Sequence, residues 1–591
     1  MPVNLTYPGV YIDEVKSSVR TITGVPTSVA AFVGYAPRGP VDRPVHLTSW
    51  ADYETVFGGL QMASPMSYAV YQFFLNGGSD AEIVRVVKED PQQRNTVRLP
   101  LPGSQRRQLP GGSSPPPKST GRNKRTAEGE AEDPPAGEEG GEAGTPAAAA
   151  PAAPAAKATP AAGQPFELLA ASPGRWAERL EVTVDYDVAK PDKNGSAAAP
   201  SSDKPVFNLT IKDAGNGLTE TYRNVTTDPG SPRSLDHQLA SSQLVRLDPD
   251  EANRLADVLP SAGDGQARPL GGNADDRPSL ADYRGSEAQK TGLHQLLKTD
   301  IFNMLCLPDC EWLQEQNGGD LSGLLTPAAT LCADRRAILL VDPPASWTAP
   351  QNGAAVSVPD VVARVKSSPV LEGDLAKNAA VYFPRVLAPD PLRGGALRPF
   401  PPSGVMAGVL ARTDVQRGVW KAPAGTDASL NGVVELEVPL TDQNIGQLNP
   451  VGVNCLRRLP AAGPVAWGAR TLRGADRLAD EWKYLPVRRL ALFIEESLFR
   501  GTQWVVFEPN DEPLWASIRL NIGAFMNTLF RAGAFQGRTP QEAYLVKCDK
   551  ENNPQNDIDR GIVNIQVGFA PLKPSEFVVV HIQQLAGQIQ V

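Results

Sequence analysis

Alternation of apolar and polar residues near the C-terminus most constrains how this chain folds. One apolar row occupies every second position and so lies on one face of a predicted strand: Val563, Ile565, Val567 and Phe569. Turn residues follow, and then Phe577–Ile582 forms a second predicted strand, so evenly apolar that we expect cover on both faces. A third alternating piece, Leu585–Val591, reaches the last residue. Because chain ends usually fray, this terminus is predicted to dock in a sheet, in its own subunit or in a neighbour.

Composition excludes several classes of protein. The 591 residues are enough for roughly four domains. A net charge of −9 and a pI near 5.3 argue against nucleic acid or an anionic membrane as the main partner. The N-terminus lacks a basic and apolar leader, and about 18 apolar residues in a row, which a membrane span needs, occur nowhere, so we expect cytoplasmic synthesis and no membrane insertion. Five cysteines, an odd number, indicate reduced thiols.

The N-terminal part divides into an arm and a first folded segment. Residues 1–27 contain a turn and the predicted strand Val10–Val15, which is typical of an extended arm. Residues 28–90 read as a strand, a helix and a strand. Ser64 is predicted to cap this helix and Pro65 to occupy its first position, and Asn76–Gly78 end it. The flanking strands are Ser28–Tyr35 and Ala81–Val87.

Residues 91–165 have a different character. Basic residues come first, an acidic Gly/Pro run follows, and Pro146–Ala162 is almost only proline and alanine. This composition cannot bury enough apolar surface to offset the entropy of ordering. We therefore predict a solvated, low-complexity segment, either a semi-extended linker or an insertion on the outside of the protein.

Structure is predicted to resume at Phe166 and to form a middle region over residues 166–400. Its predicted elements are strands at Leu180–Tyr186 and Val206–Ile211, a helix running into a strand over Leu293–Leu307, and a buried strand at Arg336–Val341. Asp342 follows the last of these strands. Strand ends of this kind often carry the sites of α/β sheets.

Residues 401–576 are predicted to form a C-terminal domain, followed by an arm at 577–591. Its predicted elements are a helix at Val487–Phe499, a strand at Gln503–Phe507, a long helix at Pro513–Ala532 and a strand at Ala543–Cys548. The long helix has a wide apolar stripe, and Arg519 and Arg531 lie off that stripe.

The sequence offers little for catalysis or metal binding. The sequence contains no GxSxG, GxxxxGK[ST] or HExxH motif, which argues against a hydrolase or phosphotransferase. Cys306, Cys310 and Cys332, with His294, form the one metal-like cluster, but structural zinc sites favour tighter pairs, so buried thiols are the preferred interpretation. Asp549–Asp559 is acidic, yet Pro554 stands where a calcium loop needs glycine. We predict no catalytic residues, cofactor or metal.

A set of segments, in order along most of the chain, carries a resemblance to a known family. They are YPGVYIDEV (Tyr7–Val15), Phe32–Gly59, Phe73–Val86, Ser172–Val184, Leu305–Cys310, Val381–Val386, Pro401–Ala424, Leu448–Arg458 and Trp504–Val580. In these segments the chain resembles the tail sheath proteins of contractile injection systems: myophage tails, R-type bacteriocins and phage-tail-like particles of bacteria.

The resemblance implies a fold and a function. The fold is α+β and multidomain: a sheath core domain built from N- and C-terminal parts, with a mixed sheet, flanking helices and inserted outer domains. The function is that of a structural, non-enzymatic subunit that forms stacked hexameric rings around an inner tube and contracts to drive the tube through a target envelope. The implied partners are the chain itself, an inner tube protein, and baseplate and cap proteins. Phage tails or tail-like particles, in some systems released from the cell, are the implied location.

The resemblance also assigns roles to residues. Two arms add strands to sheets of neighbouring subunits, through Val10, Tyr11, Ile12, Val15, Phe577, Val579, Ile582, Ile589 and Val591. The receiving sheet contains Val563, Ile565, Val567 and Phe569. Arg519 and Arg531 are candidates for contact with the inner tube, although the apolar stripe of their helix equally indicates core packing. Whether the donated C-terminal arm begins at Phe577 or at Leu585 stays open.

Two other classes of protein remain as alternatives. One is a tail-associated hydrolase or protease with a structural domain, which a convergent catalytic cluster in a pocket would favour. The other is a non-contractile structural protein of a particle. Electron microscopy that reveals two sheath lengths would favour the contractile protein over both.

Overall fold

The computed structural model describes residues 21–88, 97–103, 166–188, 206–248, 259–268, 277–317, 319–350, 357–367 and 370–579. The chain forms two compact units. Unit 1 comprises the described parts of Met1–Val97, Ala170–Glu178 and Pro269–Val591, and unit 2 those of Arg98–Leu169 and Arg179–Arg268. The predicted middle region 166–400 is thus divided between the units, and the predicted boundary at 400 lies inside unit 1. The expected arm strand Val10–Val15 lies outside the described residues.

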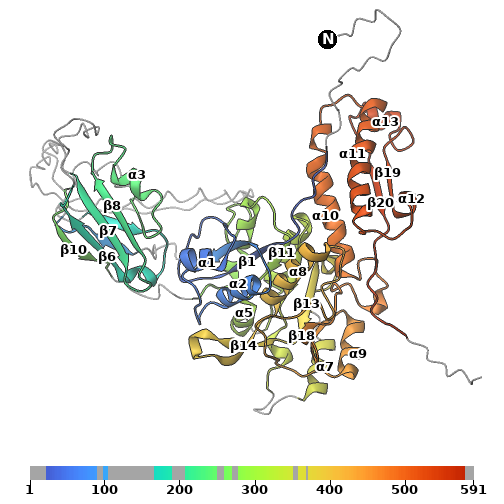
Figure 1. Cartoon of the computed structure of the whole chain (residues 1–591), viewed down its shortest axis with the longest axis horizontal. Helices are drawn as coiled ribbons and strands as arrows, with labels where there is room; N and C mark the ends of the chain where they lie inside the picture. Colours follow the sequence, from blue (N-terminus) through green and yellow to red (C-terminus); the bar gives the residue numbers. More distant parts are fainter. Residues whose placement is uncertain are drawn as a thin grey trace, which may run out of the picture. The chain divides into compact units, whose positions relative to one another are not determined.

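Unit 1 is organised around a mixed eight-stranded sheet with the order β18-β17-β13-β12-β11-β1-β3-β2. Figure 1 labels four of these strands, β1, β11, β13 and β18. The strands are β1 (Val29–Tyr35), β2 (Val45–Leu47), β3 (Asp80–Val86), β11 (Met304–Cys306), β12 (Ile338–Val341), β13 (Ala379–Phe383), β17 (Asn454–Leu459) and β18 (Gly463–Ala466). The six inner strands pair in parallel, whereas the edge strands β2 and β18 pair antiparallel with their neighbours. These observations agree with the expected mixed sheet.

The sheet is covered on both faces, because alternate residues of each strand enter different cores. On β1, Ala31 and Val33 join one apolar cluster, whereas Ala30 and Phe32 join the other. The first core is closed by α4 (Leu280–Arg284), α5 (Cys310–Gln316), α6 (Ser322–Asp334), α7 (Val358–Ser367) and α9 (Asp442–Leu448). The second is closed by α1 (Trp50–Phe57), α2 (Pro65–Leu75) and α8 (Ser403–Arg417). Burial on both sides explains the nearly continuous apolar runs of the inner strands.

The predicted helix cap at Ser64 is confirmed. Its side chain accepts a hydrogen bond from the backbone N–H of Ser67 at 3.2 Å, and α2 begins at Pro65. The helix expected within Leu293–Leu307 is a 3-10 helix, η3 (Gly292–Lys298), and it leads to β11. A smaller sheet in unit 1 contains β14 (Val386–Asp390), β15 (Ala396–Phe400) and β16 (Glu435–Leu436).

Unit 2 is built from antiparallel strands. A four-stranded sheet has the order β10-β6-β7-β8, with β6 (Leu180–Asp185), β7 (Phe207–Asp213), β8 (Thr219–Val225) and β10 (Gly263–Gln266). A three-stranded sheet contains β4 (Arg98–Pro100), β5 (Glu167–Ala170) and β9 (Val245–Arg246), and α3 (Leu235–Leu239) follows β8. Strand β4 corrects the prediction that residues 91–165 are all low-complexity insertion. Val97, Leu99 and Leu101 alternate with polar or proline positions and are buried, so they carry a genuine strand signal. Residues 104–165 lie outside the described part.

The C-terminal module, residues 485–579 of unit 1, contains α10 (Leu485–Gly501), α11 (Glu512–Arg531), α12 (Pro540–Ala543), α13 (Gln555–Asp559), β19 (Tyr544–Lys547) and β20 (Gln566–Phe569). Figure 1 shows it in orange and red, with α10 and α11 side by side. The two predicted helices are confirmed. The strand predicted at Gln503–Phe507 is wrong: Gln503–Val505 is a 3-10 helix, η9, in the short connection between α10 and α11.

Candidate assembly surfaces

The apolar stripe of α11 is used inside the module. Ile518, Ile522 and Met526 are buried and pack with Leu490 and Ile494 of α10. The Asp511 side chain caps the helix by accepting a hydrogen bond from the backbone N–H of Leu514 at 3.2 Å. A capped helix with one buried stripe is the rigid element to which the rest of the module attaches.

Beside α11 lies a small antiparallel sheet of β19 and β20. Its register pairs Tyr544 with Phe569 and Val546 with Val567. The predicted receiving residues Val563, Ile565, Val567 and Phe569 are half-buried and pack against the core of α10 and α11, but only the last two lie in β20, which begins at Gln566. Among the described residues neither outer edge of this sheet pairs with a further strand. Two-stranded sheets are marginal alone, and an unpaired edge is a template for another strand.

The chain leaves this sheet through a fixed point at Glu576. The Arg470 guanidinium, which is completely buried, donates to both carboxylate oxygens of Glu576, at 2.7 and 2.5 Å. Its remaining N–H groups reach Asp476 and the carbonyls of Asn449 and Gly474. Burial alone lowers the pKa of Arg470, but the hydrogen bond and charge of Glu576 outweigh it, so that the pKa is raised. A bidentate pair of this kind fixes direction as well as position.

Directly after this anchor three apolar side chains are exposed. Phe577, Val578 and Val579 have exposed fractions of 76%, 82% and 74%. The strand expected at Phe577–Ile582, with cover on both faces, is not formed over Phe577–Val579, because none of the described strands pairs with these three residues. Ile582, Ile589 and Val591 lie outside the described residues. Glu576 is therefore the last residue of the described chain that is held by a buried partner.

A cavity of 1070 Å³ opens at the root of this C-terminal segment. We call it the tryptophan pocket, because Trp420 and Trp467 line it together with Leu572 and Phe577. Four cations also line it, Arg417, Lys421, Arg457 and Lys573, against the two carboxylates of Asp442 and Glu576. Arg457 pairs with Asp442 at 2.8 Å, and Glu576 is held by Arg470, so the remaining charge of the rim is positive.

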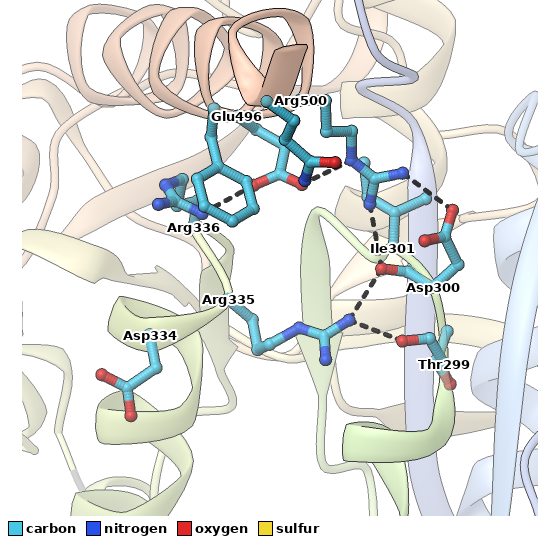
Figure 2. A pocket seen from close by; sticks show the side chains of 10 residues that line it. Thr299, Asp300, Ile301, Asp334, Arg335, Arg336, Glu496 and Arg500 are labelled. Atoms are coloured by element: carbon cyan, nitrogen blue, oxygen red, sulfur yellow. Dashed lines mark hydrogen bonds and ion pairs between the residues drawn. The ribbon is translucent and has the colours of Figure 1, made fainter. Parts of the chain in front are cut away.

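A second cavity, of 780 Å³, lies between α10 and the starts of β11 and β12 (Figure 2). Arg336 donates to Glu496 at 2.7 Å, and Arg500 donates to Glu496 and Asp300 at 2.7 and 2.9 Å. Arg335 reaches the carbonyls of Thr299 and Asp300 at 2.6 and 2.8 Å. The hydrogen bond from Arg500 lowers the pKa of Asp300. Each of the three guanidinium groups has an acidic or carbonyl partner. The ion pairs of Glu496 with Arg336 and of Arg500 with Asp300 hold α10 against the segments that precede β12 and β11.

The connection between α10 and α11 exposes two more apolar side chains. Val506 is 63% exposed, and Phe507 is 103% exposed on a backbone with φ of 70°. The apolar residues of Gln503–Phe507 led to the wrong strand prediction. The sequence shows that this stretch is apolar, but it does not show that Val506 and Phe507 are exposed.

The predicted tube contacts have different surroundings. Arg519 donates to Glu512 at 2.6 Å and to the carbonyl of Cys548, so it is partly committed to its own module. Arg531, at the C-terminal end of α11, is exposed.

The three cysteines considered for metal binding, and Asp342, lie within the fold of unit 1. Cys306, Cys310 and Cys332 are free and buried, and burial raises the pKa of each thiol. Within the described ranges no three His, Cys, Asp or Glu residues are arranged to hold a metal ion. Asp342, at the end of β12, accepts hydrogen bonds from the backbone N–H and the hydroxyl of Ser403 at 2.9 and 2.7 Å. Burial raises the pKa of Asp342 to about 7.

Sequence reasoning did not find the anchor between Arg470 and Glu576. The two residues are 106 positions apart, and neither lies in a motif. Arginine and glutamate are common on surfaces, so only the fold reveals that this arginine is buried. The exposure of Phe507 was also missed, because only the fold reveals which apolar side chains remain uncovered.

Comparison with known proteins identifies two matching family models. Residues 295–472 match the phage tail sheath protein central domain, and residues 479–584 match the phage tail sheath C-terminal domain. The tail sheath protein of Vibrio phage KVP40 is 28% identical over 182 residues, which is 31% of this chain and 26% of that relative. The match thus spans about a quarter of the length of that curated relative.

Two solved structures share the fold. The sheath complex of an extracellular contractile injection system, PVC, in its contracted state, has a TM-score of 0.50 at 19% identity, and the match covers 99% of each chain. A sheath tail protein from Listeria innocua has a TM-score of 0.51 at 11% identity, covering 93% of this chain and 96% of that one.

No helix in the described part of the chain is both long and apolar enough to cross a membrane. The two sheath domain models follow one another in order along residues 295–584, and the sheath proteins above share the fold. Residues 295–472 and 479–584 of the chain therefore comprise the central and C-terminal domains of phage tail sheath proteins.

Proposed function

We propose that this chain is a structural, non-enzymatic subunit of a contractile sheath. Copies assemble as stacked hexameric rings around an inner tube, and contraction drives the tube through a target envelope. One observation carries the proposal. An exposed apolar segment, Phe577–Val579, leaves the core immediately after a buried ionic anchor, and it follows a two-stranded sheet whose outer edges pair with none of the described strands.

Strand addition suits a lattice that must change shape. Main-chain hydrogen bonds between a donated strand and a sheet edge keep subunits connected while their compact bodies rotate. In the proposal, residues 577–591 are the donated arm and the edge of β19 and β20 receives the corresponding arm of another copy. Fifteen extended residues reach roughly 50 Å, which is enough to reach an adjacent subunit.

The anchor gives the arm a starting point. Because Arg470 holds Glu576 in the core, a load on the arm is passed to the buried side of unit 1 and not to β20 alone. We therefore place the start of the donated segment at Phe577 and not at Leu585. The N-terminal arm, with Val10–Val15, is proposed to link copies in the same way.

The proposed energy source is the lattice itself. Extended sheath is metastable in this proposal, and contraction buries additional surface between copies. Baseplate and cap proteins bind the two ends of the sheath. Of the two candidates for contact with the tube, Arg531 is the better one, because it is exposed whereas Arg519 is held by Glu512.

Deletion of residues 577–591 tests the proposal. The described part of this segment is exposed, so the truncated subunit should remain soluble, with an unchanged melting temperature, and electron microscopy should find no long sheaths. A matched control replaces the same residues by a Gly/Ser segment of equal length, which keeps the reach and removes the strand-forming side chains. Normal sheaths from the truncated subunit would contradict the proposal.

A further inference from the structure

The connection between α10 and α11 carries an apolar side chain that no described part of its own subunit covers. Phe507 is fully exposed, and its φ of 70° lies in the left-handed region, which is sterically unfavourable for a bulky residue. Val506 beside it is also exposed. Strained backbone persists where another interaction requires it. We call this pair the Val506–Phe507 knob.

Acidic residues surround the knob. Glu508 is exposed and follows Phe507 directly, and Asp511 and Glu512 begin α11. The chain has no lysine or arginine between Arg500 and Arg519. A partner that receives the knob should therefore combine an apolar cavity with a basic rim.

The tryptophan pocket has these properties. Trp420 and Trp467 provide aromatic walls, and its volume of 1070 Å³ is more than a valine and a phenylalanine side chain require. Lys421 and Lys573 stand on its rim without a carboxylate partner among the described ion pairs.

The knob and the pocket belong to opposite ends of the same helix. The knob precedes Glu512, where α11 begins, and Ala532 and Gly533, just after its last residue, line the pocket. The 20 residues of α11 span about 30 Å, so the knob cannot enter the pocket of its own subunit. Any contact between them joins two copies.

We propose that the Val506–Phe507 knob of one subunit docks in the tryptophan pocket of a second copy. Two different surfaces meet in such a contact, so it is heterologous and repeats from copy to copy as a closed ring or an open helix. The proposal rests on the proposed function, since it assigns one contact of the sheath lattice, and it is separate from strand addition by the arms. Phe507 and Trp467 are its central residues.

Cross-linking in assembled particles tests this contact. Glu508→Cys and Ser575→Cys place one thiol beside the knob and one on the pocket wall, and keep Phe507 and both tryptophans. The five native cysteines are buried, so a short bis-maleimide should react with the introduced pair. We expect a ladder of dimers, trimers and higher oligomers, because each copy carries both halves of a heterologous contact.

Matched variants define the other outcomes. Glu508→Cys alone should give no dimer, and Leu520→Cys with Ser575→Cys should give no ladder, although Leu520 is 55% exposed. Particles that form normally without a ladder from the first pair would overturn the docking while leaving the proposed function intact, as would a cross-link to another protein. An absence of sheaths from the wild-type chain would instead contradict the proposed function.

Phe507→Asn provides a second measurement that does not depend on cross-linking. Asparagine tolerates left-handed backbone, so the subunit should fold with an undiminished melting temperature. Removal of the aromatic side chain should lower the assembled fraction at least about tenfold, as for a central contact residue. Unchanged assembly of this folded variant would overturn the proposal.

Discussion

The core of unit 1 and the C-terminal module differ in how fully they bury their strands and apolar side chains. All residues of β1, β12 and β13 are buried, and the buried Asp414 of α8 accepts two hydrogen bonds of 2.8 and 2.6 Å from Arg489, at the base of the module. No residue of β19 or β20 is fully buried, and Phe507 and Phe577 are exposed. The core completes its own contacts, whereas the module keeps apolar side chains and strand edges uncovered by the described part of the chain.

This difference separates folding from assembly. A sheet covered on both faces keeps its shape under load, because its packing does not depend on neighbours. Unpaired strand edges and exposed apolar side chains gain free energy only when another chain covers them. Substitutions in the core should therefore change the stability of the isolated subunit, and substitutions in the exposed parts of the module should change assembly.

The largest expected effect concerns the ion pair of Arg489 and Asp414, in which both side chains are almost inaccessible to solvent. Arg489→Met should lower the free energy of unfolding by about 3 to 5 kcal/mol, because Asp414 is left as an unpaired buried charge. Urea denaturation measures this loss. Arg417→Met is the control, since the pair of Arg417 with Asp427 is exposed and should contribute less than about 1 kcal/mol. Equal losses from both variants would remove the distinction between buried and exposed pairs.

A pair of leucine substitutions compares the two regions directly. Leu340 in β12 is 1% exposed, so Leu340→Ala should cost about 3 kcal/mol through lost burial and a residual cavity. Leu545 in β19 is 52% exposed, and Leu545→Ala should change the free energy of unfolding by less than about 0.5 kcal/mol. Both values come from denaturation of the purified subunit. A large loss from Leu545→Ala would mean that the module is not open at this edge.

Sequence patterns predicted the core better than the module for a physical reason. Strand β12 and helix α2 are specified by local features, a buried apolar run in one case and Ser64 with Pro65 in the other. Their tertiary partners lie in the same chain, so the pattern and the environment agree. Strand β4 was missed because its alternating residues stand at the edge of a low-complexity segment.

In the C-terminal module, segments with strand-like composition occur both packed against the core and exposed to solvent. Trp504 and Val505 pack partly against the core of α10 and α11, whereas Val506 and Phe507 do not, yet all four have β-type side chains. Phe577–Val579 likewise has the composition of a strand but pairs with no strand in the described ranges. Residue type alone does not distinguish burial in the same chain from burial in another copy. The anchor of Arg470 and Glu576 depends on the fold and has no local signature.

A smaller effect should follow the protonation of Asp342 in the core. Burial raises the pKa of this carboxyl to about 7 in the folded state, above its value in the unfolded chain. The folded state therefore binds this proton more tightly, so the stabilisation is present at low pH and is lost as pH rises through about 7. Between about pH 8 and pH 6 the wild-type subunit should gain roughly 1 kcal/mol from this group.

Asp342→Asn should flatten this part of the pH profile, as measured by urea denaturation at each pH. Asp374→Asn is the control, because Lys377 lowers the pKa of the exposed Asp374 and its carboxylate stays ionised throughout this range. The control should retain the wild-type slope. An unchanged slope in Asp342→Asn would assign the pH dependence to another group.

The smallest effect has the opposite sign and concerns the module. Phe507→Asn should raise the free energy of unfolding of the isolated subunit by up to about 1 kcal/mol, because asparagine adopts the left-handed backbone with less strain. Val506→Asn is the control, since Val506 is also exposed but is not among the residues with positive φ, and it should give no gain. Denaturation of both variants beside the wild type measures the difference. A gain in stability together with a loss of assembly would mean that Phe507 stabilises the contact between copies at the expense of the single subunit, whereas a loss of stability would mean that the knob supports its own module.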